Sequence, residues 1–305
     1  MVGESGSRKE RGSRLASSRI EPMSRSRAAC AAAEKGAGMI FYFTGTGNCL
    51  HVARELAGGE GGGAQPVSIP RQMRREGELA YADDAIGIVF PLYGHLMPAM
   101  VREFIHRASF DTPYFYLIET YGRRHANGVE LAQEEARAAG VEPAYISTLL
   151  MVDNWLPSFD MDEERALIPE KRIDENLARI KADVSARKRW IEPVTDADRA
   201  AHEEFLRFGM RFEAPDLGGF LSIDGDRCTG CGACARVCPA GCISLEGGIA
   251  RRDALAGLGC NACLACIHAC PAHAISLPMG EKNPSARFCN EHVRLADIAK
   301  ANSGE

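Results

Sequence analysis

The sequence predicts an α/β protein, with a doubly wound parallel sheet followed by a helical region and a small α+β module. Three observations support this fold class. Short apolar runs alternate with helix-like stretches from Met39 onward, an amphipathic stretch follows them, and nine of the 12 cysteines fall within 228–270. At ~150 residues per domain, 305 residues suffice for about two domains.

The sheet is expected from five apolar runs, at 39–44, 66–69, 85–90, 114–119 and 144–152. Helices are expected between them at 48–57, 97–107 and 127–139. The link between the second and third runs is polar and leaves room only for a short helix. Strands and helices in this alternation predict a doubly wound sheet with the spatial order 2-1-3-4-5.

A helical connector is expected over 161–219. We predict one long helix at 162–191, because its apolar residues recur on a single face. These residues are Ile173, Leu177, Ile180, Val184 and Ile191. A second helix after Pro193 carries three aromatic residues, which we interpret as core: Phe205, Phe208 and Phe212. Gly218-Gly219 marks the boundary to the cysteine-rich module.

Composition excludes several classes of protein. No apolar run approaches the ~18 residues that a membrane span needs, and a net charge of −5 argues against a general nucleic-acid binder. A secreted disulfide scaffold would spread its cysteines over a shorter chain. The local cysteine cluster therefore indicates metal chemistry in a reducing, cytoplasmic compartment.

The first 38 residues differ from the rest. They hold six Arg, two Lys and four Glu, for a charge of +4, which leaves −9 for residues 39–305. Few large apolar residues are present, so we expect a disordered tail. Because Met39 opens directly into the first strand, our hypothesis is that translation begins there. The alternative is a genuine disordered tail.

The cysteines form an internal repeat, in which Cys-x2-Cys-x2-Cys-x3-Cys-Pro occurs twice. Residues 228–245 and 260–277 are identical at ten of eighteen positions. Three thiolates at this spacing wrap one face of a cubane, while the fourth, followed by Pro, reaches the other cluster. This assigns one [4Fe–4S] cluster, cluster I, to Cys228, Cys231, Cys234 and Cys270. It assigns a second, cluster II, to Cys260, Cys263, Cys266 and Cys238.

A pair of zinc sites is the alternative, because Cys-x2-Cys knuckles also bind zinc. The third cysteine and the Cys-Pro ending, each present twice, favour iron–sulfur clusters. The repeat resembles the bacterial two-cluster ferredoxins over 224–278. Cys242 aligns with Ala274 and is interpreted as a small buried residue. No role is assigned to Cys30 or Cys289, and His268 and His273 are expected near the ligands or at the surface.

A phosphate-binding loop is predicted at the end of the first strand. Its residues are Thr44, Gly45, Thr46, Gly47, Asn48 and Cys49. The loop opens a helix, whose first N–H groups and dipole favour an anion. A dinucleotide fingerprint would need Gly where Leu50 stands, and a P-loop would need a lysine. The loop therefore favours one terminal monophosphate, and a helix cap without a ligand is the alternative.

A flavin ring is expected where the third and fourth strands end, since the ligand crevice of such a sheet lies there. Each of these two segments offers an aromatic residue and a glycine. Tyr93 or Tyr121 could stack on the ring. The candidate residues are Pro91, Tyr93, Gly94, Thr120, Tyr121 and Gly122.

Together these motifs resemble flavodoxin, and the whole arrangement resembles the flavodoxin–ferredoxin fusion proteins of anaerobic prokaryotes. The resemblance extends from Met39 to about residue 280 and includes 153–157, Asp-Asn-Trp-Leu-Pro, after the fifth strand. It implies FMN as a cofactor, a flavodoxin-like domain at 39–160 and a two-cluster ferredoxin domain at 220–280. A C-terminal tail is expected at 281–305, with a helix near 290–300.

One position departs from that family. Cys49 stands where Ser or Thr is usual, and a thiol is a poorer phosphate donor than a hydroxyl. Because the backbone donors remain, we expect FMN to bind more weakly but still to bind.

The expected function is electron transfer between the two clusters and FMN, as a carrier for a partner redox protein. No Ser/His/Asp constellation or catalytic carboxylate pair stands out. Two alternatives remain open. One is a flavin-dependent reductase fed by the clusters, and the other is a ferredoxin whose flavodoxin-like domain binds no flavin and serves for docking. The charge of −9 on residues 39–305 suggests partners with basic docking faces.

Overall fold

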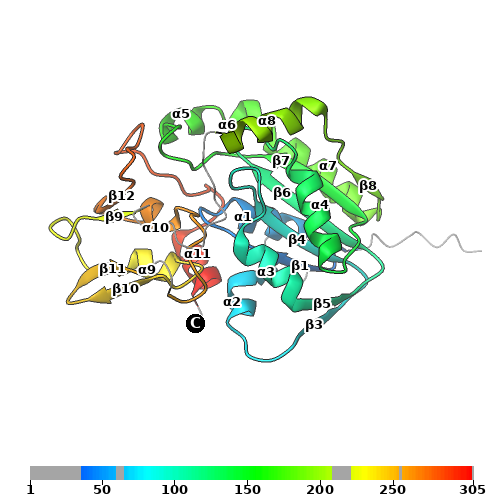
Figure 1. Cartoon of the computed structure of the whole chain (residues 1–305), viewed down its shortest axis with the longest axis horizontal. Coiled ribbons are helices and arrows are strands. Elements are labelled where there is room, and N and C mark those ends of the chain that lie inside the picture. Colours follow the sequence, from blue (N-terminus) through cyan, green and yellow to red (C-terminus); the bar gives the residue numbers. More distant parts are fainter. Residues whose placement is uncertain (1–35, 60–64, 208–220, 254–255, 304–305) are drawn as a thin grey trace, which may run out of the picture. The chain divides into compact units, whose positions relative to one another are not determined.

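A six-stranded parallel sheet organises the first half of the computed structural model (Figure 1). The structure describes residues 36–59, 65–207, 221–253 and 256–303. The strand order is β2 (Val67–Ser68), β1 (Met39–Tyr42), β4 (Ile86–Pro91), β6 (Phe115–Tyr121), β7 (Tyr145–Leu150) and β8 (Trp190–Ile191). All neighbours pair in parallel. The predicted α/β class is confirmed, and each of the five expected runs contains one strand of this sheet.

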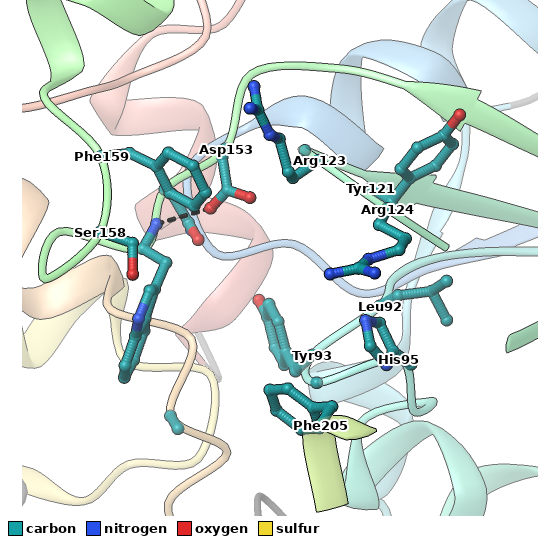
Figure 2. Close-up of a pocket in the computed structure, with 15 residues that line it drawn as sticks. Leu92, Tyr93, His95, Tyr121, Arg123, Arg124, Asp153, Ser158, Phe159 and Phe205 are labelled. Carbon is teal, nitrogen blue, oxygen red and sulfur yellow. Dashed lines mark hydrogen bonds between the residues drawn. The ribbon is translucent and has the colours of Figure 1, made fainter. Parts of the chain in front are cut away.

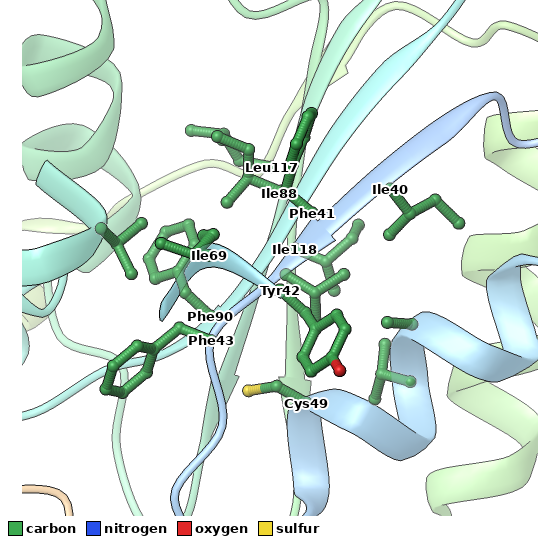
Figure 3. Packing of buried hydrophobic residues seen from close by; sticks show 14 of the residues in the cluster. Ile40, Phe41, Tyr42, Phe43, Cys49, Ile69, Ile88, Phe90, Leu117 and Ile118 are labelled. Atoms are coloured by element: carbon green, nitrogen blue, oxygen red, sulfur yellow. The ribbon is translucent and has the colours of Figure 1, made fainter. Parts of the chain in front are cut away.

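The central strands are almost wholly buried, which explains their continuous apolar sequence. The register places Phe41 beside Ile88, and Ile88 beside Leu117. Four helices follow strands of this region: α1 (Asn48–Leu56), α2 (Ile69–Met73), α3 (Ala99–Arg107) and α4 (Gly128–Ala138). Figure 3 shows α1 alongside the buried side chains of the sheet, with Cys49 directed into that core.

Two strands outside the main sheet were not expected. β3 (Leu79–Ala82) and β5 (Ala108–Asp111) form a separate parallel pair. Only Leu79 is buried in β3 and no residue is buried in β5, so neither strand has the continuous burial of the central strands. Their sequences therefore carried little strand signal.

The prediction of one long helix at 162–191 is wrong. The segment forms α5 (Met161–Ala166), α6 (Ile168–Lys171) and α7 (Ile173–Ser185), followed by β8. Pro169 lies in the first turn of α6, and Arg172 adopts a left-handed φ of 49°, which ends one helix and begins the next. The apolar stripe is real on α7, where Leu177, Ile180 and Val184 are buried.

The helix expected after Pro193 is present as α8 (Asp196–Arg207). Two of its three expected core aromatics, Phe208 and Phe212, lie outside the described residues, as does the Gly218-Gly219 boundary.

The cysteine-rich region is a small α+β module. Its strands form two antiparallel pairs, β9 (Ser222–Ile223) with β12 (Ile275–Ser276) and β10 (Ile243–Glu246) with β11 (Ile249–Arg252). Short helices α9 (Ala233–Val237) and α10 (Ala265–His268) each follow the second cysteine of a motif. The chain ends in α11 (Leu295–Asn302), close to the helix expected near 290–300.

Sheet, module and C-terminal helix share one hydrophobic core. Val237, Cys263 and Ile298 belong to the same buried cluster as Phe41 and Phe90. Residues 34–305 accordingly form one compact unit. The cysteine-rich module is therefore packed against the sheet.

Residues 1–35 of the expected tail lie outside the described part of the chain. At its end, Ala37 is buried and its carbonyl accepts a hydrogen bond from the hydroxyl of Tyr116 at 3.0 Å. Among the described helices, none has the length and apolarity to cross a membrane.

Candidate functional site: two cysteine cavities beside a phosphate loop

Two small cavities in the module are each lined by four cysteines of the two motifs, and Cys242 also borders the second. The first is bordered by the cysteines expected for cluster I: Cys228, Cys231, Cys234 and Cys270. The second is bordered by those expected for cluster II: Cys238, Cys260, Cys263 and Cys266. Each cavity thus takes three cysteines from one motif and the fourth from the other. Four thiols around one cavity are the donor set that a four-iron cluster requires.

Backbone N–H groups point at the fourth cysteine of each motif. The amide of Cys242 donates to Cys238 Sγ at 3.3 Å, and the amide of Ala274 donates to Cys270 Sγ at 3.2 Å. The amide of Ala250 donates to Cys228 Sγ at 3.4 Å and lowers the pKa of that thiol. Such bonds stabilise thiolates, the form that binds iron.

Exposure differs between the two cavities. Cys231 of the first is exposed, whereas Cys263 and Cys266 of the second are buried. Cys242 also lines the second cavity, and its thiol donates to the carbonyl of Ala256 at 3.4 Å. The interpretation of Cys242 as a buried residue is confirmed. Within the described ranges, no three His, Cys, Asp or Glu side chains converge as they would around a single metal ion.

The predicted phosphate loop joins β1 to α1 and borders a cavity of about 50 Å3. Gly47 precedes the helix with a φ of 103°, a conformation that favours glycine. The first N–H groups of α1 have no acceptor within the helix, so they remain available to an anion. Thr44 Oγ1 accepts from the amide of Gly47 at 3.1 Å, which leaves its hydroxyl proton free to donate.

Asn48 is committed to protein contacts. Its side-chain Nδ2 donates to the carbonyl of Val152 at 3.0 Å, and its Oδ1 accepts from Nδ2 of Asn290 at 3.0 Å. Cys49 is buried, with Sγ 3.2 Å from Thr120 Oγ1, and burial raises the pKa of its thiol to about 12. At neutral pH Cys49 is therefore an uncharged thiol that adds no negative charge to the loop.

A further cavity of about 300 Å3, called the large cavity below, continues from the loop along the carboxyl ends of β4 and β6 (Figure 2). Six residues line both this cavity and the smaller one beside the phosphate loop: Leu92, Tyr93, Tyr121, Gly122, Asp153 and Asn154. Eleven of the twelve predicted FMN residues border one cavity or the other, and Gly47 is the exception. A small recess beside the phosphate loop therefore leads into a larger recess with aromatic residues in its wall.

Two tyrosines were candidates to stack on a flavin. The ring of Tyr93 borders the large cavity in Figure 2, opposite Phe159, whereas the ring of Tyr121 is turned away from it. The side chain of Tyr121 instead makes a hydrogen bond with the side chain of Thr148, and its ring centroid lies 5.2 Å from that of His125. Phe205, expected to be core, borders the large cavity and packs on His95 at 4.9 Å between ring centroids.

The segment after β7 joins the phosphate loop to the second cysteine cavity. The side-chain amide of Asn154 donates through Nδ2 to Thr46 Oγ1 and to the carbonyl of Cys263, both at 3.3 Å. His268 accepts from the amide of Phe288 through Nδ1 at 3.0 Å, so its Nε2 carries the proton and donates to the carbonyl of Asn154 at 3.0 Å. Ala262 lines both the large cavity and the second cysteine cavity.

Two ionisable groups, the half-buried Asp153 and the buried His95, border the large cavity, and a third, the buried Glu119, lies on β6. Burial raises the pKa of Asp153 to about 6, although the amide of Trp155 donates to its carboxylate at 2.8 Å. Burial lowers the pKa of His95 to about 4, and Nδ1 of His202 lies 3.3 Å from its own Nδ1. Both carboxyl oxygens of Glu119 are buried with no hydrogen-bond partner among the described residues, and burial holds its pKa well above the usual range.

Several residues at the site were not among the predicted ones. Asp153, Asn154 and Trp155 stood in the family-like stretch after the fifth strand, but no role was assigned to them. Ala262 was visible only as a spacer between Cys260 and Cys263. Their position follows from contacts between segments more than 100 residues apart, which sequence spacing does not encode.

Two parts of the chain match family models. Residues 221–244 match a 4Fe-4S binding domain, and residues 258–280 match a second 4Fe-4S binding domain. No curated protein matches the chain. The two matches identify a ferredoxin-type iron–sulfur module and support a role in electron transfer.

Proposed function

We propose that the protein transfers electrons between two [4Fe–4S] clusters and an FMN, as a redox carrier for a partner oxidoreductase. The observation that carries this proposal is a shared wall. Ala262 lines the cavity proposed for the flavin ring and the cavity of four cysteines proposed for cluster II. FMN exchanges one or two electrons, whereas each cluster exchanges one, so their contact permits both kinds of exchange.

The proposed ligands are the four cysteines of each cavity. Cluster I would be held by Cys228, Cys231, Cys234 and Cys270, and cluster II by Cys260, Cys263, Cys266 and Cys238. The two matches to 4Fe-4S binding domains support iron rather than zinc. N–H groups directed at the sulfur atoms would stabilise the reduced, more negative clusters and so influence their potentials.

A flavodoxin-like role is proposed for the sheet. The spatial order β2-β1-β4-β6-β7, to which β8 adds a sixth strand, supports this role. The FMN phosphate would be bound by N–H groups of the loop from Thr44 to Cys49, with the hydroxyl of Thr44 as a further donor. The ring would lie in the large cavity, where Tyr93 is the stacking residue that we favour.

The proposed electron path runs from cluster I through cluster II to FMN. Cys231 gives cluster I the exposed edge that a partner protein needs. Two of the proposed ligands of cluster II, Cys263 and Cys266, are buried, and the carbonyl of Cys263 lies against Gly45 of the phosphate loop, so cluster II suits an internal relay. The net charge of −9 on residues 39–305 supports a partner with a basic docking face.

The extents proposed for the functional parts remain 39–160 for FMN, 161–219 for the connector and 220–280 for the clusters, with a C-terminal tail at 281–305. The connector contributes Phe205 to the flavin cavity, so it also helps to form the site.

Anaerobic purification with quantification of iron, sulfide and flavin tests the proposal. We expect eight irons and one FMN per chain, and reductive titration should bleach flavin and cluster absorbance in separable steps. Eight irons without flavin, even after FMN is added, would support the docking alternative and contradict our proposal. Zinc in place of iron would contradict the cluster assignment as well.

The crosswise ligand assignment has its own test. Cys238→Ser should remove cluster II, as Cys260→Ser should, although Cys238 lies in the first motif. Cys242→Ala is the matched control, because Cys242 borders the same cavity and aligns with Ala274. Loss of cluster I, rather than cluster II, in Cys238→Ser would overturn the assignment.

A further inference from the structure

The C-terminal segment, residues 286–302, touches both the phosphate loop and the cysteine module. We propose that this segment is the positioning element that sets the geometry of electron transfer between cluster II and FMN, with Asn302 as its central residue. The inference rests on the proposed function. It gives a role to residues that were expected to form a C-terminal tail.

Asn302 bridges the two halves of the site. Its side chain is fully buried, and its amide nitrogen donates to the carbonyl of Thr44 at 3.1 Å and to the carbonyl of Val237 at 2.9 Å. Thr44 begins the phosphate loop, and Val237 directly precedes Cys238, a proposed ligand of cluster II. One planar group thus holds together the peptide groups beside both cofactors.

The chemistry of this contact is specific to an amide. The two hydrogens of one NH2 group serve two acceptors, which a hydroxyl or a carboxylate cannot do. Without them, two buried carbonyls would lose a partner, at a cost of roughly 1–3 kcal/mol each. The demand for two donors at one nitrogen therefore selects Asn at this position.

A second contact lies on the other side of the phosphate loop. The amide of Asn290 donates to the carbonyl of Thr46 at 2.9 Å, and its side chain donates to Asn48 at 3.0 Å. A Cβ added at Gly47 would lie 3.0 Å from Cβ of Asn290 and 3.2 Å from Cβ of Val293. The loop therefore lies directly against the segment, with no room for a side chain between them.

These contacts also orient the donors of the loop. In a trans peptide the C=O and the following N–H point in opposite directions. Because Asn302 holds the carbonyl of Thr44, the N–H of Gly45 is directed away from the C-terminal segment. That orientation leaves the N–H free for a phosphate in the adjoining cavity, which Gly45 lines.

Helix α11 is itself anchored at several points. The hydroxyl of Ser68 donates to the carbonyl of Ala301, and Arg54 pairs with Asp297 at 3.3 Å. The helix packs on α9 of the module and on α2 beside the sheet. A displacement of α11 would therefore move the phosphate loop relative to Cys238, and with it the separation of the two cofactors.

Asn302→Leu tests the inference in the anaerobic full-length protein loaded with iron and FMN. Leu has a similar volume but no donors. We expect at least tenfold weaker FMN binding. At saturating FMN, electron transfer from flash-reduced flavin to the clusters should be at least tenfold slower, with eight irons retained. Asp297→Asn is the control, since it removes a contact of the same helix that reaches neither cofactor, and both quantities should stay within twofold of wild type.

Several outcomes separate the possibilities. A lower melting temperature in Asn302→Leu, with an unchanged transfer rate and unchanged FMN affinity, would make Asn302 merely structural and overturn the inference. If the wild type binds no FMN, the proposed function fails instead. Hydrogen exchange at residues 44–49 needs no flavin, and it should be faster in Asn302→Leu than in Asp297→Asn.

If Asn302→Leu does not fold, Asn290→Ala provides the second variant. It removes the side-chain contact to Asn48 but keeps both bridges of Asn302. We expect weaker FMN binding and faster exchange at 44–49, with eight irons retained. Wild-type values of both affinity and exchange in this variant would contradict the role of the segment.

Discussion

Gly45 lies where the phosphate loop meets the proposed ligand Cys263, and replacing it with alanine tests that contact directly. The new Cβ would lie 2.7 Å from the carbonyl oxygen of Cys263, 3.2 Å from its Cβ and 3.1 Å from the hydroxyl of Tyr93. The backbone of Gly45 does not adopt a left-handed φ, so Ala adds only volume. The carbonyl belongs to the backbone and cannot rotate away as a side chain would.

The expected magnitude follows from these distances. Carbon–oxygen contacts normally begin at about 3.3 Å, so loop and module must separate by roughly 0.6 Å. Overpacking of this kind costs about 1–3 kcal/mol. In a chain of this size each kcal/mol lowers the melting temperature by about 2–4 °C. We therefore expect Gly45→Ala to melt roughly 2–12 °C lower and to bind FMN more weakly.

Anaerobic thermal denaturation and FMN titration provide the assay. Gly225→Ala is the matched control, because it lies in the module and its new Cβ would meet Ile249 at an ordinary 3.7 Å. A Gly45→Ala protein that melts within 1 °C of wild type (~0.3 kcal/mol) and binds FMN as tightly would refute the close packing of loop and module.

Three further predictions concern groups around the cavities. Asp153→Asn should tighten FMN binding at pH 7–8 by roughly fivefold, on the order of 1 kcal/mol, because the ionised carboxylate opposes the phosphate; an unchanged dissociation constant would count against this. Burial raises the pKa of Glu119 in the folded protein. Above the ordinary pKa of a glutamate, the unfolded state therefore loses this proton while the folded state keeps it. Stability should therefore fall as pH rises from about 5 to 8, and Glu119→Gln should flatten that dependence in urea unfolding. Cys49→Ser should bind FMN as tightly as wild type or more tightly, since a hydroxyl is the better donor, and a clear loss of affinity by fluorescence titration would contradict that reasoning.

The clusters were the part of the site most open to prediction. Six of the eight proposed ligands lie within two windows of seven residues, so their spacing alone restricts the geometry. The loop between the first strand and the first helix was also predictable, because its glycines stand between an apolar run and an amphipathic stretch; its binding of a phosphate stays a prediction. Both features depend on contacts between residues that are close in the chain.

Prediction failed where local signals competed. The stripe over 173–191 suggested one helix, yet Pro169 and the left-handed Arg172 divide its N-terminal part, and Ile191 pairs with Ile146 in the sheet. Trp190 and Ile191 form a strand because β7 offers an open edge beside them. That edge exists only once the sheet has formed.

The amino-acid sequence by itself determined the α/β class, the two cysteine motifs and the loop between the first strand and helix, because each rests on periodicity or short spacing. Only the tertiary structure decided that Ala262 separates the two proposed cofactor sites and that Asn302 joins Thr44 to Val237. Thr44 lies 193 positions before Val237 in the chain. Their relation depends on how the sheet, module and last helix pack into one core, which no local pattern specifies.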